Sequence, residues 1–187
     1  MSINDLHGLL GLQPSSEEIS DQIRRLSSLV DSPNAAIPVI KSYPDAVYHN
    51  YVTLGISLLF VRTPTDLILD SIDVYNVEAG TNGRMTSERG FSTYPVVPLT
   101  LTHGEEKIEI YGGTTGKEFV KSIGEPERKG GGSGPSSGSI GIWCEWKKVG
   151  LMVELDARGV QAWDKGKDAV WRVITLFPCD YYIKTSY

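Results

Sequence analysis

The side chains able to perform nucleophilic or metal chemistry are few in this sequence and lie far apart. They are three histidines and two cysteines: His7, His49, His103, Cys144 and Cys179. None of the histidines has another histidine or a cysteine at the close spacing of a metal site, so we predict no metal and no cofactor. A Cys–His pair could generate a thiolate nucleophile, but no local motif indicates one. We therefore predict no catalytic residue and expect a protein that is not an enzyme.

Two glycine-containing stretches resemble phosphate-binding loops, and neither fits the chemistry. In "YGGTTGKE" (111–118), Tyr111 stands where a P-loop needs its first glycine, and Glu118 stands where a hydroxyl should bind magnesium. The run "KGGGSGPSSGS" (129–139) lacks the third glycine of a dinucleotide fingerprint and precedes a strand instead of a helix. We predict no nucleotide binding. The run has no apolar side chain to bury, so we expect a flexible insertion.

Aromatic residues are better candidates for function, as contacts for a partner. In "IWCEWK" (142–147) side chains alternate between the two faces of a strand, which places Trp143 on the same face as Glu145 and Lys147. A rigid aromatic side chain among polar neighbours suits a binding surface. We predict three partner contacts: Tyr48, Trp143 and Trp163. The alternative for Trp143 is that it packs beneath a helix, the insertion or the other half of the chain.

Composition limits the classes of partner. The 187 residues carry a net charge of −5, with 40% hydrophobic and 22% charged residues, which is ordinary for a soluble globular protein. An acidic chain lacks the basic footprint of a nucleic-acid binder, and no apolar run reaches the ~20 residues of a membrane span. No signal peptide is evident, so we expect a cytoplasmic protein in which Cys144 and Cys179 are reduced thiols.

Hydrophobic periodicity predicts helices at the start of the chain and strands after Pro44. Ile3, Leu6, Leu9 and Leu10 share one helical face, and a second helix begins at a capping box made by Ser15 and Glu18. A short helix is expected from Thr114 or Thr115 to Gly124. Strand-like segments occupy 46–61, 67–77, 139–146, 150–156 and 171–178, and two short strands flank a turn at 103–105. Trp163 falls in a polar loop.

The two halves of the sequence align with each other. Residues 47–60 match 142–155 without a gap, which sets Gly55 on Gly150, and residues 69–75 match 171–177. Upstream, "VIKSYPD" (39–45) resembles "FVKSIGEPE" (119–127). That match pairs Pro44 with Pro126 and makes the glycine-rich run an insertion of 13 residues. Chance similarity between strands is the alternative explanation.

These observations predict an α+β fold. It is expected to be a tandem repeat of a helix plus antiparallel β-sheet unit, with the helices packed against the sheet. The first copy would span 1–94 and the second 95–187, the second carrying the Gly/Ser-rich insertion at 129–139, in one compact unit.

Several stretches resemble a class of small two-repeat α+β binding proteins. They are "LLGLQPSSEEI", "GISLLF", "DSIDVYN", "YPVVPLTL" and "FVKSIGEPE", which resemble bacterial immunity-type proteins encoded beside toxins. The layout is also similar to β-lactamase-inhibitor-like folds and, more distantly, to phagosome assembly factor proteins. The resemblance implies a non-catalytic protein that binds another protein, here through two packed sheets. The alternative is a small enzyme, or a binder of a small molecule, lipid or carbohydrate, with its site between the sheets.

Overall fold

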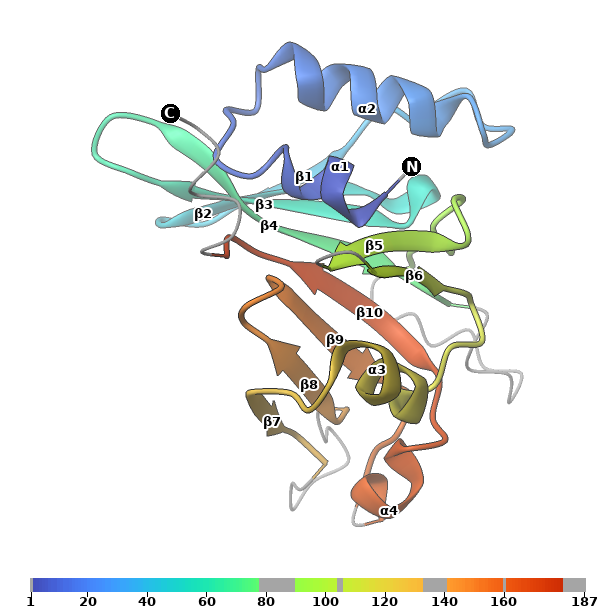
Figure 1. Ribbon diagram of the computed structural model, residues 1–187. Helices are drawn as coiled ribbons and strands as arrows, with labels where there is room; N and C mark the ends of the chain where they lie inside the picture. Colours follow the sequence, from blue (N-terminus) through green and yellow to red (C-terminus); the bar gives the residue numbers. More distant parts are fainter. Residues whose placement is uncertain (1, 78–89, 104–105, 133–140, 160, 180–187) are drawn as a thin grey trace.

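The computed structural model describes residues 2–77, 90–103, 106–132, 141–159 and 161–179. Within these residues, eight strands form one antiparallel sheet in the order β1-β2-β3-β4-β10-β9-β8-β7 (Figure 1). The strands are β1 (Val39–Ser42), β2 (Ala46–Tyr51), β3 (Ile56–Arg62), β4 (Leu67–Tyr75), β7 (Arg128–Gly130), β8 (Trp143–Trp146), β9 (Leu151–Leu155) and β10 (Trp171–Leu176). The predicted α+β class with an antiparallel sheet is confirmed.

The two halves of the chain share this sheet, because β4 pairs with β10 at its centre. Val74 of β4 lies opposite Ile174 of β10, and the pairing continues to Ile72 and Leu176. The expectation of two packed sheets was therefore wrong. Backbone hydrogen bonds at the β4–β10 seam join the strands of the two halves into one eight-stranded sheet.

Smaller elements cover one face of the sheet (Figure 1). They are α1 (Ile3–His7), α2 (Glu17–Ser27), α3 (Gly116–Ile123) and a hairpin of β5 (Leu99–His103) and β6 (Glu106–Ile110). Beneath them, Leu58, Ile72, Leu176 and Leu151 stand side by side across four strands, and all four are fully buried. Burying each such side chain stabilises the fold by about 1.5–3 kcal/mol, so this row holds the two halves together.

Local chemistry sets the helix boundaries. In α3, Thr115 and Glu118 form a capping box, and the helix ends at Gly124, as predicted. The predicted box of Ser15 and Glu18 was wrong, because α2 is capped by Ser16 and that residue makes no side-chain capping bond. The backbone N–H of Ser16 instead donates to the carbonyl of Gln13 at 3.0 Å, and this turn delays the helix by one residue.

Helix α1 is shorter than the periodicity predicts, because the following backbone pairs with the sheet. The N–H of Gly11 donates to the Leu69 carbonyl, and the N–H of Leu69 donates to the Leu12 carbonyl, both at 2.8 Å. The helix itself contacts the second half of the chain. His7 Nε2 lies 3.0 Å from the carbonyl oxygen of Gly150.

Strand registers in the two halves correspond position by position. Tyr48 faces Leu59 between β2 and β3, and the residues 95 positions further on, Trp143 and Glu154, face each other between β8 and β9. Each half also has one irregularity, between β3 and β4 in the first half and between β9 and β10 in the second. The skipped residue is Asp70 in the first half and Arg172, 102 positions further on, in the second.

The upstream part of the sequence alignment was wrong. "VIKS" forms strand β1, whereas "FVKS" lies on helix α3, so the two segments differ in structure. The register instead sets Lys41 opposite Tyr48 and Gly130 opposite Trp143. Lys41 and Tyr48 are seven positions apart, and Gly130 and Trp143 are 13 positions apart. The β7–β8 connection is therefore six residues longer than the β1–β2 connection, whereas the sequence alignment predicted an insertion of 13 residues.

The Gly/Ser-rich insertion also begins later than predicted. Its first two residues, 129 and 130, belong to β7, and residues 133–140 lie outside the described part of the chain.

Candidate partner-binding surface

The face of the sheet opposite the described helices, which we call the outer face, carries a row of buried and half-buried polar side chains. Asn50, Ser57, Asp73 and Thr175 follow one another across β2, β3, β4 and β10. Ser57 Oγ donates to Asn50 Oδ1 at 2.9 Å, and Thr175 Oγ1 donates to Asp73 Oδ1 at 2.7 Å. These hydrogen bonds satisfy polar groups within the sheet and fix the side chains of the outer face.

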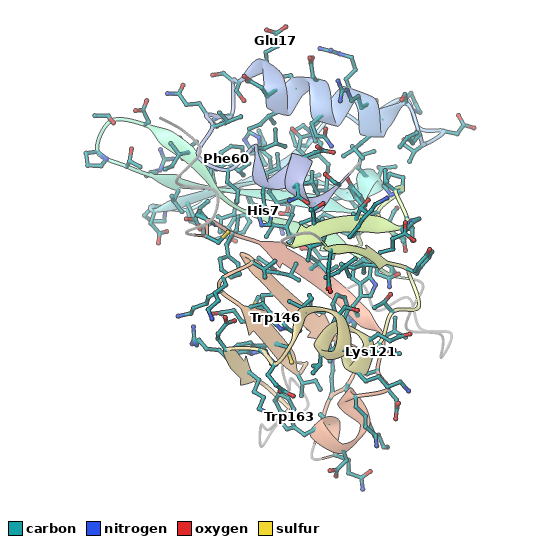
Figure 2. The ribbon with its side chains drawn as sticks, viewed as in Figure 1. His7, Glu17, Phe60, Lys121, Trp146 and Trp163 are labelled. Carbon is teal, nitrogen blue, oxygen red and sulfur yellow. The ribbon has the colours of Figure 1, made fainter. Side chains whose placement is uncertain are left out.

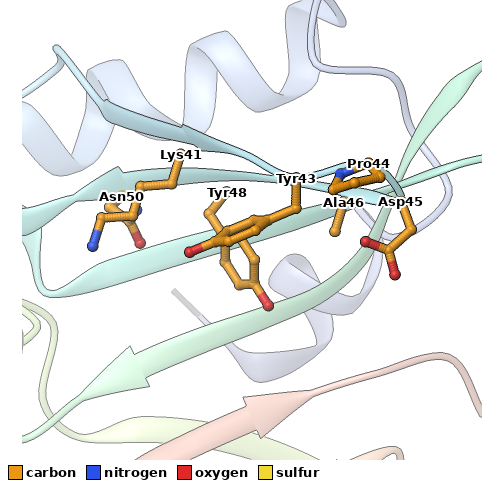
Figure 3. A pocket seen from close by; sticks show the side chains of 7 residues that line it. All are labelled: Lys41, Tyr43, Pro44, Asp45, Ala46, Tyr48 and Asn50. Carbon is orange, nitrogen blue, oxygen red and sulfur yellow. The ribbon is translucent and has the colours of Figure 1, made fainter.

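A pocket of about 370 Å³ opens on the outer face at the β1–β2 hairpin (Figure 3). The rings of Tyr43 and Tyr48 meet edge to face in it, with their centroids 5.8 Å apart. The other residues that line it are Lys41, Pro44, Asp45, Ala46 and Asn50. The structure thus places the predicted contact Tyr48 beside a second tyrosine, in a hollow of the size that takes one side chain or a small ligand.

The edge strand β1 beside this pocket exposes apolar side chains. All four of its residues are exposed, Ile40 by 55%, and the flanking residues Ile37 and Tyr43 are 66% and 52% exposed. Asn50 Nδ2 donates to the Val39 carbonyl at 3.1 Å and anchors the strand to β2. Sequence periodicity missed β1, although the β-branched pair after Pro38 in "IPVIKSY" was a signal for a strand.

Trp143 occupies the outer face at the opposite end of the sheet. Its ring is half-buried, packs against Gly130, and has the Arg128 guanidinium 5.8 Å from its centroid. The predictions were a binding contact or packing beneath a helix, the insertion or the other half of the chain. The contact with Gly130 is a contact with the predicted insertion, which began at residue 129. The cover comes from a basic side chain of the neighbouring strand, which forms a cation–π contact.

Trp163 lies on a short helix, α4 (Ala162–Gly166), instead of in the polar loop that the sequence predicted (Figure 2). Its side chain is 41% exposed, and its Nε1 donates to the carbonyl of Gly131 at 3.3 Å. The Lys129 ammonium lies 6.0 Å from the ring centroid. Contacts to β7 and the residue after it therefore fix the orientation of this exposed ring.

The structure does not bring the three predicted contacts together. Tyr48 is on the second strand of the sheet and Trp143 on the seventh, which separates them by roughly 24 Å at about 4.8 Å per strand. Trp163 contacts Lys129, whereas Trp143 contacts Arg128. Consecutive strand residues point to opposite faces, so the two tryptophans lie on opposite faces of the sheet near β7.

His49 and Cys144, which were considered for nucleophilic chemistry, lie apart on the second and seventh strands of the sheet, whereas His7 and Cys179 both lie beside Gly150. His49, on β2, faces the covered side with its ring 4.8 Å from that of Phe60, and burial lowers its pKa. Cys144, on β8, is a buried free thiol, and burial raises its pKa while Lys129 acts in the opposite direction. Cys179 is likewise a buried free thiol, as expected. In the part of the chain that the structure describes, no group of three or more His, Cys, Asp or Glu residues is placed to hold a metal ion.

The fold and surface define an α+β protein with an eight-stranded antiparallel sheet, covered on one face by the described helices and the β5–β6 hairpin (Figure 1). No known family, curated protein or solved structure matches the chain. Among the described residues, no helix is both long enough and apolar enough to cross a bilayer.

Proposed function

We propose that this chain is a non-catalytic protein-binding module, of the immunity or inhibitor kind, that recognises another protein through its outer face. The observation that carries this proposal is the pocket formed by Tyr43 and Tyr48 on the outer face at the β1–β2 hairpin (Figure 3). Tyrosine offers a large contact area with little loss of side-chain entropy, and such residues dominate interface energetics.

The pocket residues suit a protein partner more than a reaction. Tyr43 and Tyr48 present ring edges and hydroxyls, and Lys41 and Asp45 supply opposite charges at the rim. An apolar centre with a polar rim is the usual anatomy of an interface. The net charge of −5 favours encounter with a basic partner.

Trp163 is proposed as a second, separate contact, because its ring is exposed and held in place by Gly131. Trp143 is proposed as a weaker one, since Arg128 must move before a partner reaches the ring. A Trp143→Ala variant that folds and keeps full affinity for the partner would remove Trp143 from this role.

We further propose that the sheet is a duplicated unit, with copies in 1–94 and 95–187. Three features support this: matching registers, matching irregularities at Asp70 and Arg172, and glycines at corresponding turns. An experimental structure in which β2–β4 and β8–β10 fail to superpose would refute it.

The function is tested by recovering the partner from native lysate and measuring its affinity by calorimetry. A Tyr43→Ser/Tyr48→Ala double variant is expected to bind at least about tenfold more weakly, as loss of an aromatic hot spot does. Tyr111→Ser is the matched control, because Tyr111 is as exposed as Tyr43 (52% each) but lies outside the pocket. Unchanged affinity in a folded double variant would refute the proposed surface.

A further inference from the structure

We propose that β1 pairs antiparallel with β1 of a second copy of this chain, about a two-fold axis at Ile40. The two eight-stranded sheets would then continue into each other. The inference rests on the edge strand alone and does not depend on the proposed partner.

The two edges of the sheet differ in how well they are protected. In natural proteins, charged side chains, a short strand or a covering segment normally prevent an edge strand from pairing with another chain. The β7 edge has three residues, of which two are basic, and Trp163 packs beside it. The β1 edge has only Lys41 as a charge, and Ile37, Val39, Ile40 and Tyr43 around it are all exposed apolar side chains. The unprotected edge is therefore the one expected to gain a neighbour.

Backbone hydrogen bonding shows which residues of β1 point away from β2. The N–H of Tyr43 donates to the Ala46 carbonyl at 2.7 Å, which makes this a hydrogen-bonded pair. Such pairs alternate along an antiparallel ladder, so Val39 and Lys41 also direct their backbone groups toward β2. The backbone groups of Ile40 and Ser42 point outward, where a further strand would bind.

A two-fold pairing must set outward-pointing residues opposite each other, which leaves few registers. Centring on Lys41 would oppose two ammonium groups, and like charges directly opposite each other are destabilising. Centring on Ser42 sets Ile40 opposite Pro44, and centring on Ile40 sets Ser42 opposite Pro38, so each register loses N–H donors to a proline and the side chains must decide between them. Centring on Ser42 would place two polar serines at the axis. Centring on Ile40 sets Ile40 opposite itself, so this pair can exchange both backbone hydrogen bonds.

The exposed apolar side chains are arranged symmetrically about Ile40. With the axis there, Ile37 lies opposite Tyr43 of the second copy, and Val39 lies opposite the aliphatic stem of Lys41. Ile37 and Tyr43 are 66% and 52% exposed, so the pairing would cover two of the most exposed apolar side chains described. This self-complementarity favours a second copy over an unrelated strand, because a two-fold interface requires the same patch on both sides.

Sedimentation velocity on the full chain over a range of concentrations tests the dimer. The wild type is expected to show a concentration-dependent monomer–dimer equilibrium, and Ile40→Lys is expected to weaken it at least tenfold. Leu29→Lys is the matched control, since Leu29 is 57% exposed and Ile40 is 55% exposed. Circular dichroism and urea unfolding establish that each variant folds.

Three results would overturn the dimer: a wild type that stays monomeric up to millimolar concentration, species larger than a dimer, or equal weakening by Leu29→Lys. Larger species count against it because a two-fold pairing closes on itself.

Disulfide trapping then tests the register. Ile40→Cys is expected to cross-link the two copies quickly under mild oxidation. Lys41→Cys is expected to react slowly, because its two copies would lie two positions apart and beyond the Cα separation of about 7 Å that a disulfide spans. Leu29→Cys should not cross-link above the collision rate. Faster reaction of Lys41→Cys than of Ile40→Cys would overturn the Ile40-centred register.

Discussion

Gly55 and Gly150 adopt the same left-handed conformation in corresponding turns, with φ of 61° and 67°. The carbonyl of Gly55 accepts from the N–H of Tyr75 at 2.9 Å, and that of Gly150 accepts from the N–H of Phe177 at 3.0 Å. A Cβ on Gly55 would collide with the backbone of Ser92, and one on Gly150 with the carbonyl of Phe177. Conformation and space therefore both require glycine at these two turns.

Substituting either glycine should destabilise the protein. We expect Gly55→Ala and Gly150→Ala each to lower the free energy of unfolding by about 2 kcal/mol or more, measured by urea denaturation. Gly11→Ala is the control, because Gly11 has φ of 83° but open space around its missing Cβ. If Gly11→Ala lowers the free energy of unfolding as much as the other two substitutions do, the collision of the added Cβ with the backbone is not what destabilises them.

His7 should make stability depend on pH. Burial lowers its pKa from 6.5, and the contact of Nε2 with the Gly150 carbonyl at 3.0 Å raises the pKa by less, so the net effect favours the neutral ring in the folded protein. The unfolded chain binds a proton near pH 6.5 and the folded chain only at lower pH. The free energy of unfolding should therefore fall as pH drops from 7 through 6.5 toward the lower pKa of the folded state.

The His7→Gln variant separates this contribution from others. We expect a smaller loss of stability between neutral and mildly acidic pH than in the wild type, measured by denaturant unfolding at each pH. Some dependence should remain, because burial lowers the pKa of His49 as well. An unchanged pH dependence in a folded variant would show that His7 titrates alike in both states.

Cys144 should be unreactive in the folded protein. Only a thiolate attacks an alkylating reagent, and burial raises the pKa of this thiol. We expect iodoacetamide to modify Cys144 at least about tenfold more slowly than it modifies glutathione near neutral pH. Peptide mass spectrometry measures the rate, and the same protein in urea is the control. Rapid modification of the folded protein would support the enzyme alternative.

Gly130 should control the position of the Trp143 ring. A Cβ at residue 130 would stand 2.5 Å from Trp143 Cζ2, so Gly130→Ala must displace the indole. We expect a shift in tryptophan emission that is absent when the same change is made in a Trp143→Phe background. Gly113→Ala is the control, because nothing lies within 4 Å of its added carbon. Identical spectra for wild type and Gly130→Ala would contradict the described packing.

The parts of the fold that could be predicted from sequence are those with strong local signals. Helix α3 has a capping box at its start and a glycine at its end, and both boundaries follow from Thr115 and Gly124. Strand β9 alternates buried and half-buried residues, and the turn glycines Gly55 and Gly150 align the strands of the two halves. Hydrophobic alternation and the residue types at turns are set by a few neighbouring residues, so they can be recognised in the sequence alone.

The parts that failed depend on contacts between distant residues. Strand β1 is exposed along its length and β7 has only three residues, so neither shows the alternation that identifies a strand. The pairing of β4 with β10 joins segments about 100 residues apart, and no local pattern distinguishes one shared sheet from two packed sheets. The same limit applies to the site. Tyr48, Trp143 and Trp163 were predicted as partner contacts because they are aromatic residues among polar ones. Only the strand order shows that Tyr48 and Trp143 lie far apart on the sheet.

The contact between His7 and Gly150 has a consequence for synthesis on the ribosome. The two residues are 143 positions apart, so α1 emerges long before its partner exists. At 5–20 residues per second, roughly 7–29 s pass between the two events. Ile3 and Leu6 are fully buried in the folded protein. Throughout that interval they have no second half of the chain to pack against. The nascent chain therefore presents an apolar N-terminal segment that chaperones are suited to shield until translation passes Gly150.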